Sequence, residues 1–197
     1  MLLRLTSLVA VSAIASQPAL ADDFAQYTVG VGVSPFGGSV HGAYNSSPET
    51  TIFVALGGLP TSEAPFSPEI DGKEYTVTAG SSWVGCFVNH RPLENAEWFR
   101  VNVGIGIGSI QNELEDSDGN VYKADYNENP VGYVGVGVGG RAVQGFNLGF
   151  DMGWLQTAGP DIHMVEGSGE NASDAIGDNM MFGSVLPNLQ LTLNWGF

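Results

Sequence analysis

The segment that decides the fold is 189-LQLTLNWGF-197, at the C-terminal end of the sequence. Its apolar residues occupy every second position and alternate with Gln190, Thr192, Asn194 and Gly196. A period of two is typical of a β-strand, because successive side chains point to opposite faces. One face of this strand is therefore bulky and apolar, and the other is small and polar.

The same alternation recurs three times upstream, in VNVGIGI (101–107), VGVGV (134–138) and FNLGFDMGW (146–154). In each segment the large apolar residues share one face, and glycine, asparagine or aspartate occupies the other. A face of glycines and amides makes a poor hydrophobic core, but it suits the crowded polar lumen of a membrane barrel. The pattern predicts a barrel whose apolar face is turned outward, towards lipid.

Turn signals divide the chain into eight expected strands, at 24–34, 38–45, 50–59, 73–89, 97–111, 122–139, 143–157 and 182–197. Short turns alternate with long segments near 60–72, 112–121 and 158–181, as in barrels with short periplasmic turns and long external loops. Backbone groups in hydrocarbon must all be paired, so the strands are expected to close into a ring. The predicted fold class is all-β: an eight-stranded antiparallel up-and-down transmembrane β-barrel with an N-terminal signal peptide. Both termini would be periplasmic, and side chains would nearly fill the lumen, apart from a narrow cleft left by the inward glycines.

The N-terminal segment has the layout of a secretory signal. Arg4 supplies a positive charge, residues 8–14 are apolar, and Ala19-Leu20-Ala21 precedes Asp22. The apolar run is much shorter than the roughly 20 residues of a transmembrane helix. We expect residues 1–21 to be a signal peptide and residues 22–197 to form the barrel.

The charge balance excludes one class of partner. The chain has 6 Lys+Arg and 21 Asp+Glu, a net charge of −15 at pH 7. Nucleic acid is not an expected partner, because phosphate binding needs basic patches. Cys86 is the single cysteine and cannot form an internal disulfide. Its orientation is left open, because the alternation is irregular over 81–88 and a bulge is expected there.

Three segments resemble strands of known bacterial outer-membrane barrels: 186–197, 133–139 and 147–154. The first, with Trp195 and Phe197, is similar to the closing strand whose last aromatic residue the barrel insertion machinery recognises. The other two resemble the Y-x-G-x-G and x-x-G-F-D-x-G strands of small proteins of the OmpA/OmpW-like outer-membrane class. The resemblance implies an outer-membrane location, with outer-membrane lipid, lipopolysaccharide and the insertion machinery as partners.

Four polar residues fall on the inferred lumen face: Arg100, Asn102, Asn147 and Asp151. Charges inside a barrel need partners. We therefore predict a lumen network that plugs and stabilises the barrel. Outside the lumen, interfacial aromatic girdles are expected at Trp98, Tyr133, Trp154 and Trp195.

Two long segments are rich in acidic residues. One interpretation is divalent-cation binding by oxygen ligands, with bridging to lipopolysaccharide phosphates and with candidates Asp116, Asp118, Asp161 and Glu166. The other is a solvated, mutually repelling surface loop. Residues 116–119 fail the calcium-loop motif, because Leu114 stands at its first ligand position. The metal is left unknown, and no cofactor is expected.

His163, Glu166 and Ser168 lie in one loop, where a lipid A-modifying enzyme would carry its catalytic residues. Their closeness in sequence does not supply the oriented base that a triad requires, so we expect no enzyme. The leading hypothesis is an integral outer-membrane barrel with a structural role in the envelope and passage of small solutes, through a narrow pore or as apolar molecules. The alternatives are a lipid A-modifying enzyme and a secreted soluble ligand-binding barrel, and fold alone does not choose among them.

Overall fold

The computed structural model describes residues 24–127, 130–168 and 172–197. The signal peptide expected over 1–21 lies outside these residues. The elements are β1 (Tyr27–Ser34), β2 (Gly37–Asn45), β3 (Thr50–Glu63), β4 (Glu69–Ile70), β5 (Lys73–His90), β6 (Phe99–Asp116), β7 (Val121–Asn127), β8 (Val131–Gly139), β9 (Gly145–Gln156), β10 (Asp161–Glu166), α1 (Ser173–Gly177) and β11 (Val185–Gly196).

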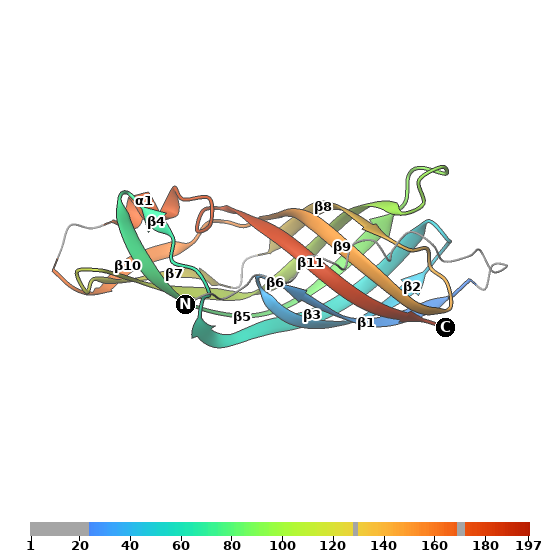
Figure 1. Cartoon of the computed structure of the whole chain (residues 1–197), viewed down its shortest axis with the longest axis horizontal. Helices are drawn as coiled ribbons and strands as arrows, with labels where there is room; N and C mark the ends of the chain where they lie inside the picture. Colours follow the sequence, from blue (N-terminus) through green and yellow to red (C-terminus); the bar gives the residue numbers. More distant parts are fainter. Residues whose placement is uncertain (1–23, 128–129, 169–171) are drawn as a thin grey trace, which may run out of the picture.

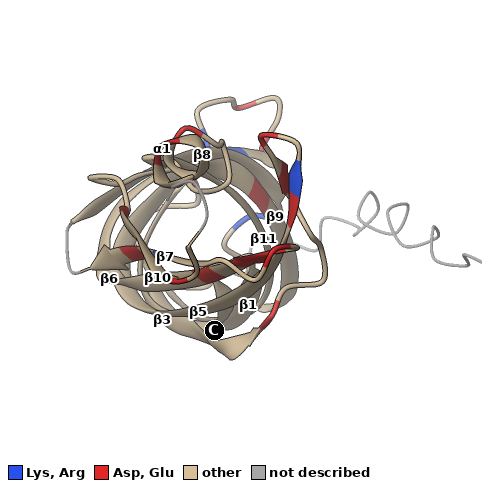
Figure 2. Ribbon diagram, turned by 90° about the vertical axis from the view of Figure 1, so that its left-hand side faces the viewer, with Lys and Arg blue, Asp and Glu red and all other residues tan. Residues whose placement is uncertain are grey.

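Eight of the eleven strands in the described chain form a closed ring, in the order β6-β8-β9-β11-β1-β2-β3-β5 and back to β6 (Figure 1). The pairings are antiparallel, so the expected all-β antiparallel barrel is confirmed. Figure 2 looks along the axis of the ring. Thr28 of β1 pairs with Gly196 of β11, so the described chain starts and finishes at one end of the ring, which we call the termini end.

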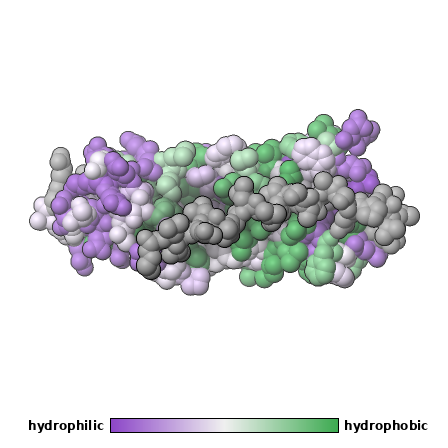
Figure 3. Space-filling view, in the orientation of Figure 1, coloured by the Kyte–Doolittle hydropathy of each residue, from purple (hydrophilic) through white to green (hydrophobic). Residues whose placement is uncertain are grey.

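Apolar side chains cover the outside of the ring. On β9, Phe146, Leu148, Phe150, Met152 and Trp154 are 41–66% exposed, whereas Asp151 between them is 6% exposed. The apolar residues of β1, β6, β8 and β11 are exposed in the same way. They form the hydrophobic band visible in Figure 3. The predicted outward orientation of the apolar face is therefore confirmed.

The segment 122–139, predicted as one strand, is in fact two. β7 pairs with β6 from Ser109 to Glu115, whereas β8 pairs with β6 from Phe99 to Gly106. Only β8 belongs to the ring. The strands predicted at 50–59 and 97–111 are longer than expected, since β3 and β6 continue to Glu63 and Asp116.

Beyond the ring the sheet continues as β10-β7-β6-β5-β4, with α1 beside it; we call this part the cap (Figure 1). The cap has its own hydrophobic core, made by Ile70, Tyr75, Val77, Leu114, Tyr122, Ala124, Ile176 and Phe182. The segments near 112–121 and 158–181, predicted as long loops, therefore contribute strands and a helix to a packed unit. In the described residues no helix is long and apolar enough to cross a bilayer.

β5 and β6 run through both the ring and the cap, and the face that carries their apolar side chains changes between the two parts. On β5, Val77 is buried in the cap, and it lies on the same face of the strand as Trp83, which lines the lumen. Val84, on the opposite face, is 42% exposed. On β6, Leu114 is fully buried in the cap, whereas Ile107 on the opposite face is 54% exposed on the ring. The inward face thus stays the same along each strand, while the apolar residues move from outside to inside.

Cys86 lies on the exposed outer face of β5. The bulge expected within 81–88 is on the neighbouring strand instead. The register between β3 and β5 shifts between Leu59 and Ser62, where the partners on β5 are Ser81 and Ala79. β3 therefore has one extra residue there, whereas β5 pairs with β6 without a break from Tyr75 to His90.

Candidate functional site: the barrel lumen

A buried ion pair lies on the inner wall of the ring. Arg100 Nε donates to Asp151 Oδ1 at 2.9 Å, and Arg100 Nη2 donates to Asp151 Oδ2 at 2.5 Å. Asn102 Nδ2 also donates to Asp151 Oδ1 at 2.5 Å. The two charged side chains are 6% and 8% exposed. The structure therefore brings three of the four predicted lumen residues into one hydrogen-bonded network.

A glycine allows this pair to form. Arg100 is on β6 and Asp151 is on β9, and β8 lies between those strands with Gly137 in register with both residues. A Cβ atom on Gly137 would overlap the Asp151 carboxylate. The bare backbone therefore lets the guanidinium reach over β8 and bind the carboxylate side-on, a geometry that favours strong charge-assisted hydrogen bonds.

Aromatic rings line the lumen beside this network. Ring centroids are 5.7 Å apart between His41 and Phe53, 5.0 Å between Phe53 and Phe87, and 5.9 Å between Phe87 and Tyr133. His41 Nε2 lies 2.6 Å from Asn194 Oδ1, within hydrogen-bond distance. The glycines that predicted a narrow cleft therefore make room for these rings, and we call the four rings the aromatic layer.

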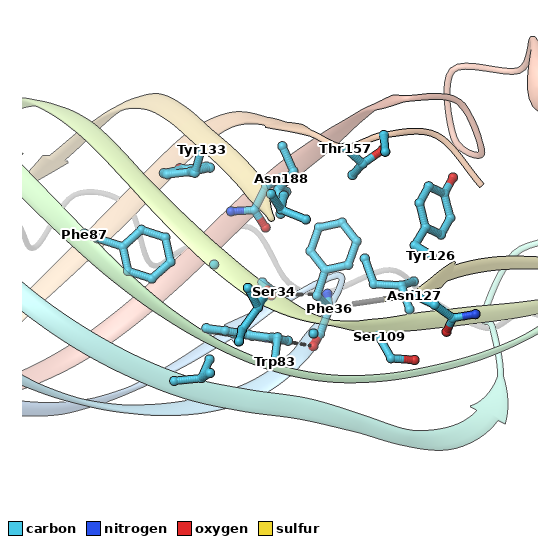
Figure 4. A pocket seen from close by; sticks show the side chains of 18 of the residues that line it. Ser34, Phe36, Trp83, Phe87, Ser109, Tyr126, Asn127, Tyr133, Thr157 and Asn188 are labelled. Carbon is cyan, nitrogen blue, oxygen red and sulfur yellow. Dashed lines mark hydrogen bonds between the residues drawn. The ribbon is translucent and has the colours of Figure 1, made fainter. Parts of the chain in front are cut away.

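On the cap side of this layer is an apolar chamber with a volume of about 90 Å³. Its walls include Phe36, Trp83, Phe87, Tyr133 and Leu155 (Figure 4). The turn between β1 and β2 is fastened over it, because the Phe36 carbonyl oxygen accepts hydrogen bonds from Trp83 Nε1 at 3.1 Å and from Ser81 Oγ at 2.8 Å.

Tyr133 was predicted to join an outer aromatic girdle, and this prediction is wrong. Its ring points into the lumen, where it contacts Phe87. The alternation of β8 explains the error, since Val134 and Val136 are the exposed residues of that strand. The three tryptophans predicted with it, Trp98, Trp154 and Trp195, are 59%, 52% and 44% exposed.

On the termini side is a polar chamber of about 60 Å³. Its walls include Arg91, Arg100, Arg141, Asn147 and Asp151. Asn147 does not join the Arg100 network; its Nδ2 donates to the Arg141 carbonyl oxygen at 2.9 Å. Arg91 is not among the lumen residues predicted from sequence, because it follows β5 in a short turn. The sequence feature that could have identified Arg91 is the small number of basic residues, 6 Lys+Arg against 21 Asp+Glu, which makes each of them a candidate for a specific role.

Ala25 is held beside the polar chamber by two residues that line it, Ala142 and Asn45. Ala25 N donates to the Ala142 carbonyl oxygen at 3.0 Å, and Asn45 Nδ2 donates to the Ala25 carbonyl oxygen at 2.7 Å. At the same end, Trp195 packs against Phe146 with centroids 4.6 Å apart, and Phe197 stacks on Tyr27 at 6.2 Å. Trp195 and Phe197, the predicted insertion signal, therefore sit on the outer face of the last strand, 44% and 55% exposed.

Two of the four candidate cation ligands bind Lys73 in the cap. Its Nζ lies 3.4 Å from Asp116 Oδ2 and 3.0 Å from Asp118 Oδ2. Asp116 is buried and also accepts hydrogen bonds from the backbone N–H groups of Asp118 and Asn120 and from the Asn120 side chain. Burial opposes its ionisation, but these hydrogen bonds and Lys73 lower the pKa of Asp116 to about 2.

The other two candidates lie elsewhere. Asp161 begins β10 opposite Asp125, and Glu166 ends the same strand opposite Val121. Within the described residues, no group of three or more His, Cys, Asp or Glu side chains is arranged to hold a metal ion. His163 is on β10 opposite Lys123, and Ser168 follows the strand.

No protein-family model matches the sequence, and no curated protein matches it. Several solved structures are similar in fold, and they include the following three. CarO of Acinetobacter baumannii has a TM-score of 0.65 at 14% identity and covers 90% of this chain and 100% of its own. CarO2 of the same organism has a TM-score of 0.67 at 12% identity, covering 89% and 100%. A major outer membrane protein of Thermus thermophilus has a TM-score of 0.52 at 11% identity, covering 87% and 98%. At these identities the similarity concerns the fold, which is that of outer-membrane barrels.

Proposed function

We propose that this protein is an integral outer-membrane barrel that is not an enzyme and supports the bacterial envelope. The observation that carries the proposal is the band of exposed apolar side chains around the closed ring (Figure 3). A soluble monomer rarely exposes an apolar surface of this extent, whereas a membrane barrel requires it. The band therefore favours lipid over water as the surroundings of the ring, and disfavours the secreted soluble alternative.

The proposed orientation places the cap outside the cell and both termini in the periplasm. The acidic residues of the cap strands (Figure 2) suit an aqueous surface. Trp195 and Phe197 would meet the insertion machinery at the opposite end. Contact between the acidic cap and lipopolysaccharide phosphates would need divalent cations as bridges, with Asp118, Asp161 and Glu166 as ligands. Loss of protease protection of the cap in intact cells after EDTA treatment, restored by Mg²⁺, would support this bridge.

The ring in this state is proposed to be closed to ions. The aromatic layer and the Arg100–Asp151 pair both occupy the lumen. Planar-bilayer recordings of the purified protein should show no steady single-channel conductance. The Phe87→Ala, Arg100→Ala double variant should raise conductance, and Trp98→Phe, at an exposed residue in the turn before β6, should not. Steady conductance of the unaltered protein would contradict the closed state.

Passage of small apolar solutes is a second candidate function, favoured by the apolar chamber below the cap. The aromatic layer would have to move to admit a solute to the polar side. Uptake of a small fluorescent aromatic compound into proteoliposomes should rise in Phe87→Ala if this route exists. Equal uptake by empty vesicles, the unaltered protein and this variant would exclude it.

Two measurements separate the remaining alternatives. The protein should be extracted from the outer membrane only with detergent, and its recovery in the soluble periplasm would contradict the membrane proposal. Lipid A mass spectra from cells with and without the protein should be identical. A new acylation or deacylation product would overturn the non-enzymatic assignment in favour of a lipid A-modifying enzyme.

A further inference from the structure

Positive charge is concentrated in one place in this acidic protein. The chain has only 6 Lys+Arg, and Arg4 belongs to the expected signal peptide. Three of the remaining five, Arg91, Arg100 and Arg141, line the polar chamber at the termini end. Asp151 is the single acidic residue among the lining side chains. The chamber is therefore electropositive inside a protein with a strongly negative total charge.

The three arginines differ in their partners. Arg100 binds Asp151, as described, and Arg141 Nη2 lies 2.6 Å from Glu97 Oε1 at the rim. Arg91 forms no ion pair within the described residues, although it is only 7% exposed. Its Nη2 donates to the Gly140 carbonyl oxygen at 2.5 Å, while Nε and Nη1 are buried without any hydrogen-bond partner in the described chain.

A buried cation without a counter-charge is strongly unfavourable, and its unpaired N–H donors add to the cost. Burial, followed by the positive charge of Arg100, lowers the pKa of Arg91 to about 10. The side chain therefore stays protonated at neutral pH. Such a group is a fixed positive charge with donors to spare, which is the chemistry of an anion site.

Unpaired acceptors face the same chamber. Asn89 Oδ1 and Asn147 Oδ1 are both buried and lack a hydrogen-bond donor within the described residues. An oxyanion that also carries a hydroxyl group can accept from arginine and donate to amide oxygens. The chamber volume of about 60 Å³ is well above the roughly 10–15 Å³ that one water molecule needs, so a molecule of a few heavy atoms fits.

We propose that the polar chamber binds a small hydroxyl-bearing oxyanion at Arg91, of which inorganic phosphate is the simplest example. Arg141, whose side chain is 40% exposed, lies at the rim of the chamber and is paired with Glu97, so Arg91 carries the uncompensated charge of the site. Because Arg100 neutralises Asp151, the repulsion that this carboxylate would exert on the anion is largely cancelled. The site does not depend on whether the lumen conducts.

The test is thermal unfolding of the detergent-purified protein during a phosphate titration, with ionic strength held constant by NaCl. Ligand binding to the folded state should raise the unfolding midpoint saturably, by roughly 2–4 °C at about fivefold excess over Kd. Arg91→Gln should lose this response and Arg91→Lys should keep part of it. Lys123→Gln, which makes the same charge change in the cap, should respond like the unaltered protein.

Phosphate-31 NMR line broadening checks binding directly, and should be seen with the unaltered protein and be absent with Arg91→Gln. The NMR comparison does not depend on the unfolding midpoint, so it stays valid if Arg91→Gln alters stability. Arg91→Lys, which retains the charge, serves as a second comparison. The proposal is overturned if phosphate gives no saturable rise beyond chloride, or if Arg91→Gln responds as the unaltered protein does. An equal response to acetate would overturn the requirement for a hydroxyl group.

Discussion

The Phe87 and Tyr133 rings meet edge to face with centroids 5.9 Å apart, although β6 lies between the strands that carry them. Gly104 of β6 is in register with both residues. Gly137 stands in the same relation to Arg100 and Asp151. Both lumen contacts thus pass over a glycine, and each depends on the missing side chain of the strand between.

Gly104→Ala should therefore destabilise the barrel. The added Cβ would overlap the Phe87 ring, and overpacking of this kind costs about 1–3 kcal/mol. Gly42→Ala is the matched control, because a Cβ there meets nothing within 4 Å. Urea unfolding in lipid vesicles measures both free energies of unfolding. Equal effects of the two substitutions would refute the packing role of Gly104.

Removal of one partner from the Arg100–Asp151 pair should cost more than removal of both. Either single alanine substitution leaves a buried charge unpaired, a loss of about 3–5 kcal/mol. The double variant leaves neither charge and should be more stable than the sum of the single losses predicts. Unfolding of Arg100→Ala, Asp151→Ala and the double variant gives the coupling energy. Strictly additive losses would mean that the pair is not coupled.

Acid should weaken the cap through Asp116. Because its pKa is lowered to about 2, its stabilising contribution is complete above the unfolded pKa of 3.8 and is lost as pH falls towards 2. The thermal midpoint should fall over this window in the unaltered protein. In Asp116→Asn the fall should be much smaller, whereas the exposed Asp118→Asn should retain it. Parallel pH profiles of the unaltered protein and Asp116→Asn would contradict this assignment.

Cys86 should be shielded by lipid. It lies on the outer face of β5, two residues from the exposed Val84. A charged, water-soluble maleimide should label it slowly in vesicles and rapidly after unfolding in detergent and urea. Asp118→Cys in a Cys86→Ser background provides the control, because the Asp118 side chain is 65% exposed in the cap. Rapid labelling of Cys86 in intact vesicles would place it in water.

The ring was predictable from sequence because period-two alternation is a local signal that each strand carries alone. The Arg100–Asp151 contact followed from burial of two opposite charges on the inferred lumen face. The cap was harder to predict. Leu114, Tyr122 and Ala124 alternate with charged residues, and the density of acids made the segment look like a solvated loop.

The polar chamber could not be predicted by the same means. Arg91, Arg141 and Asn147 come from three separate segments, and only closure of the ring brings them together. The division of residues 122–139 into β7 and β8 was equally hidden. It depends on which part of β6 each strand pairs with. β6 is long enough to pair with β8 in the ring and with β7 in the cap.

In the proposed membrane setting, the reversal of polarity along β5 and β6 would also determine how deeply the ring sits in the bilayer. Moving the ring towards its cap end would take Val84 and Ile107 into water, and moving it the other way would take the acidic cap strands into hydrocarbon. The boundary between hydrocarbon and water would therefore lie between these two residues and Val77 and Leu114, at a fixed level on both strands. Exchanging apolar for polar residues at successive outer positions of β5 and β6 would shift this boundary along the strands. The distance between the cap and the bilayer would change with it.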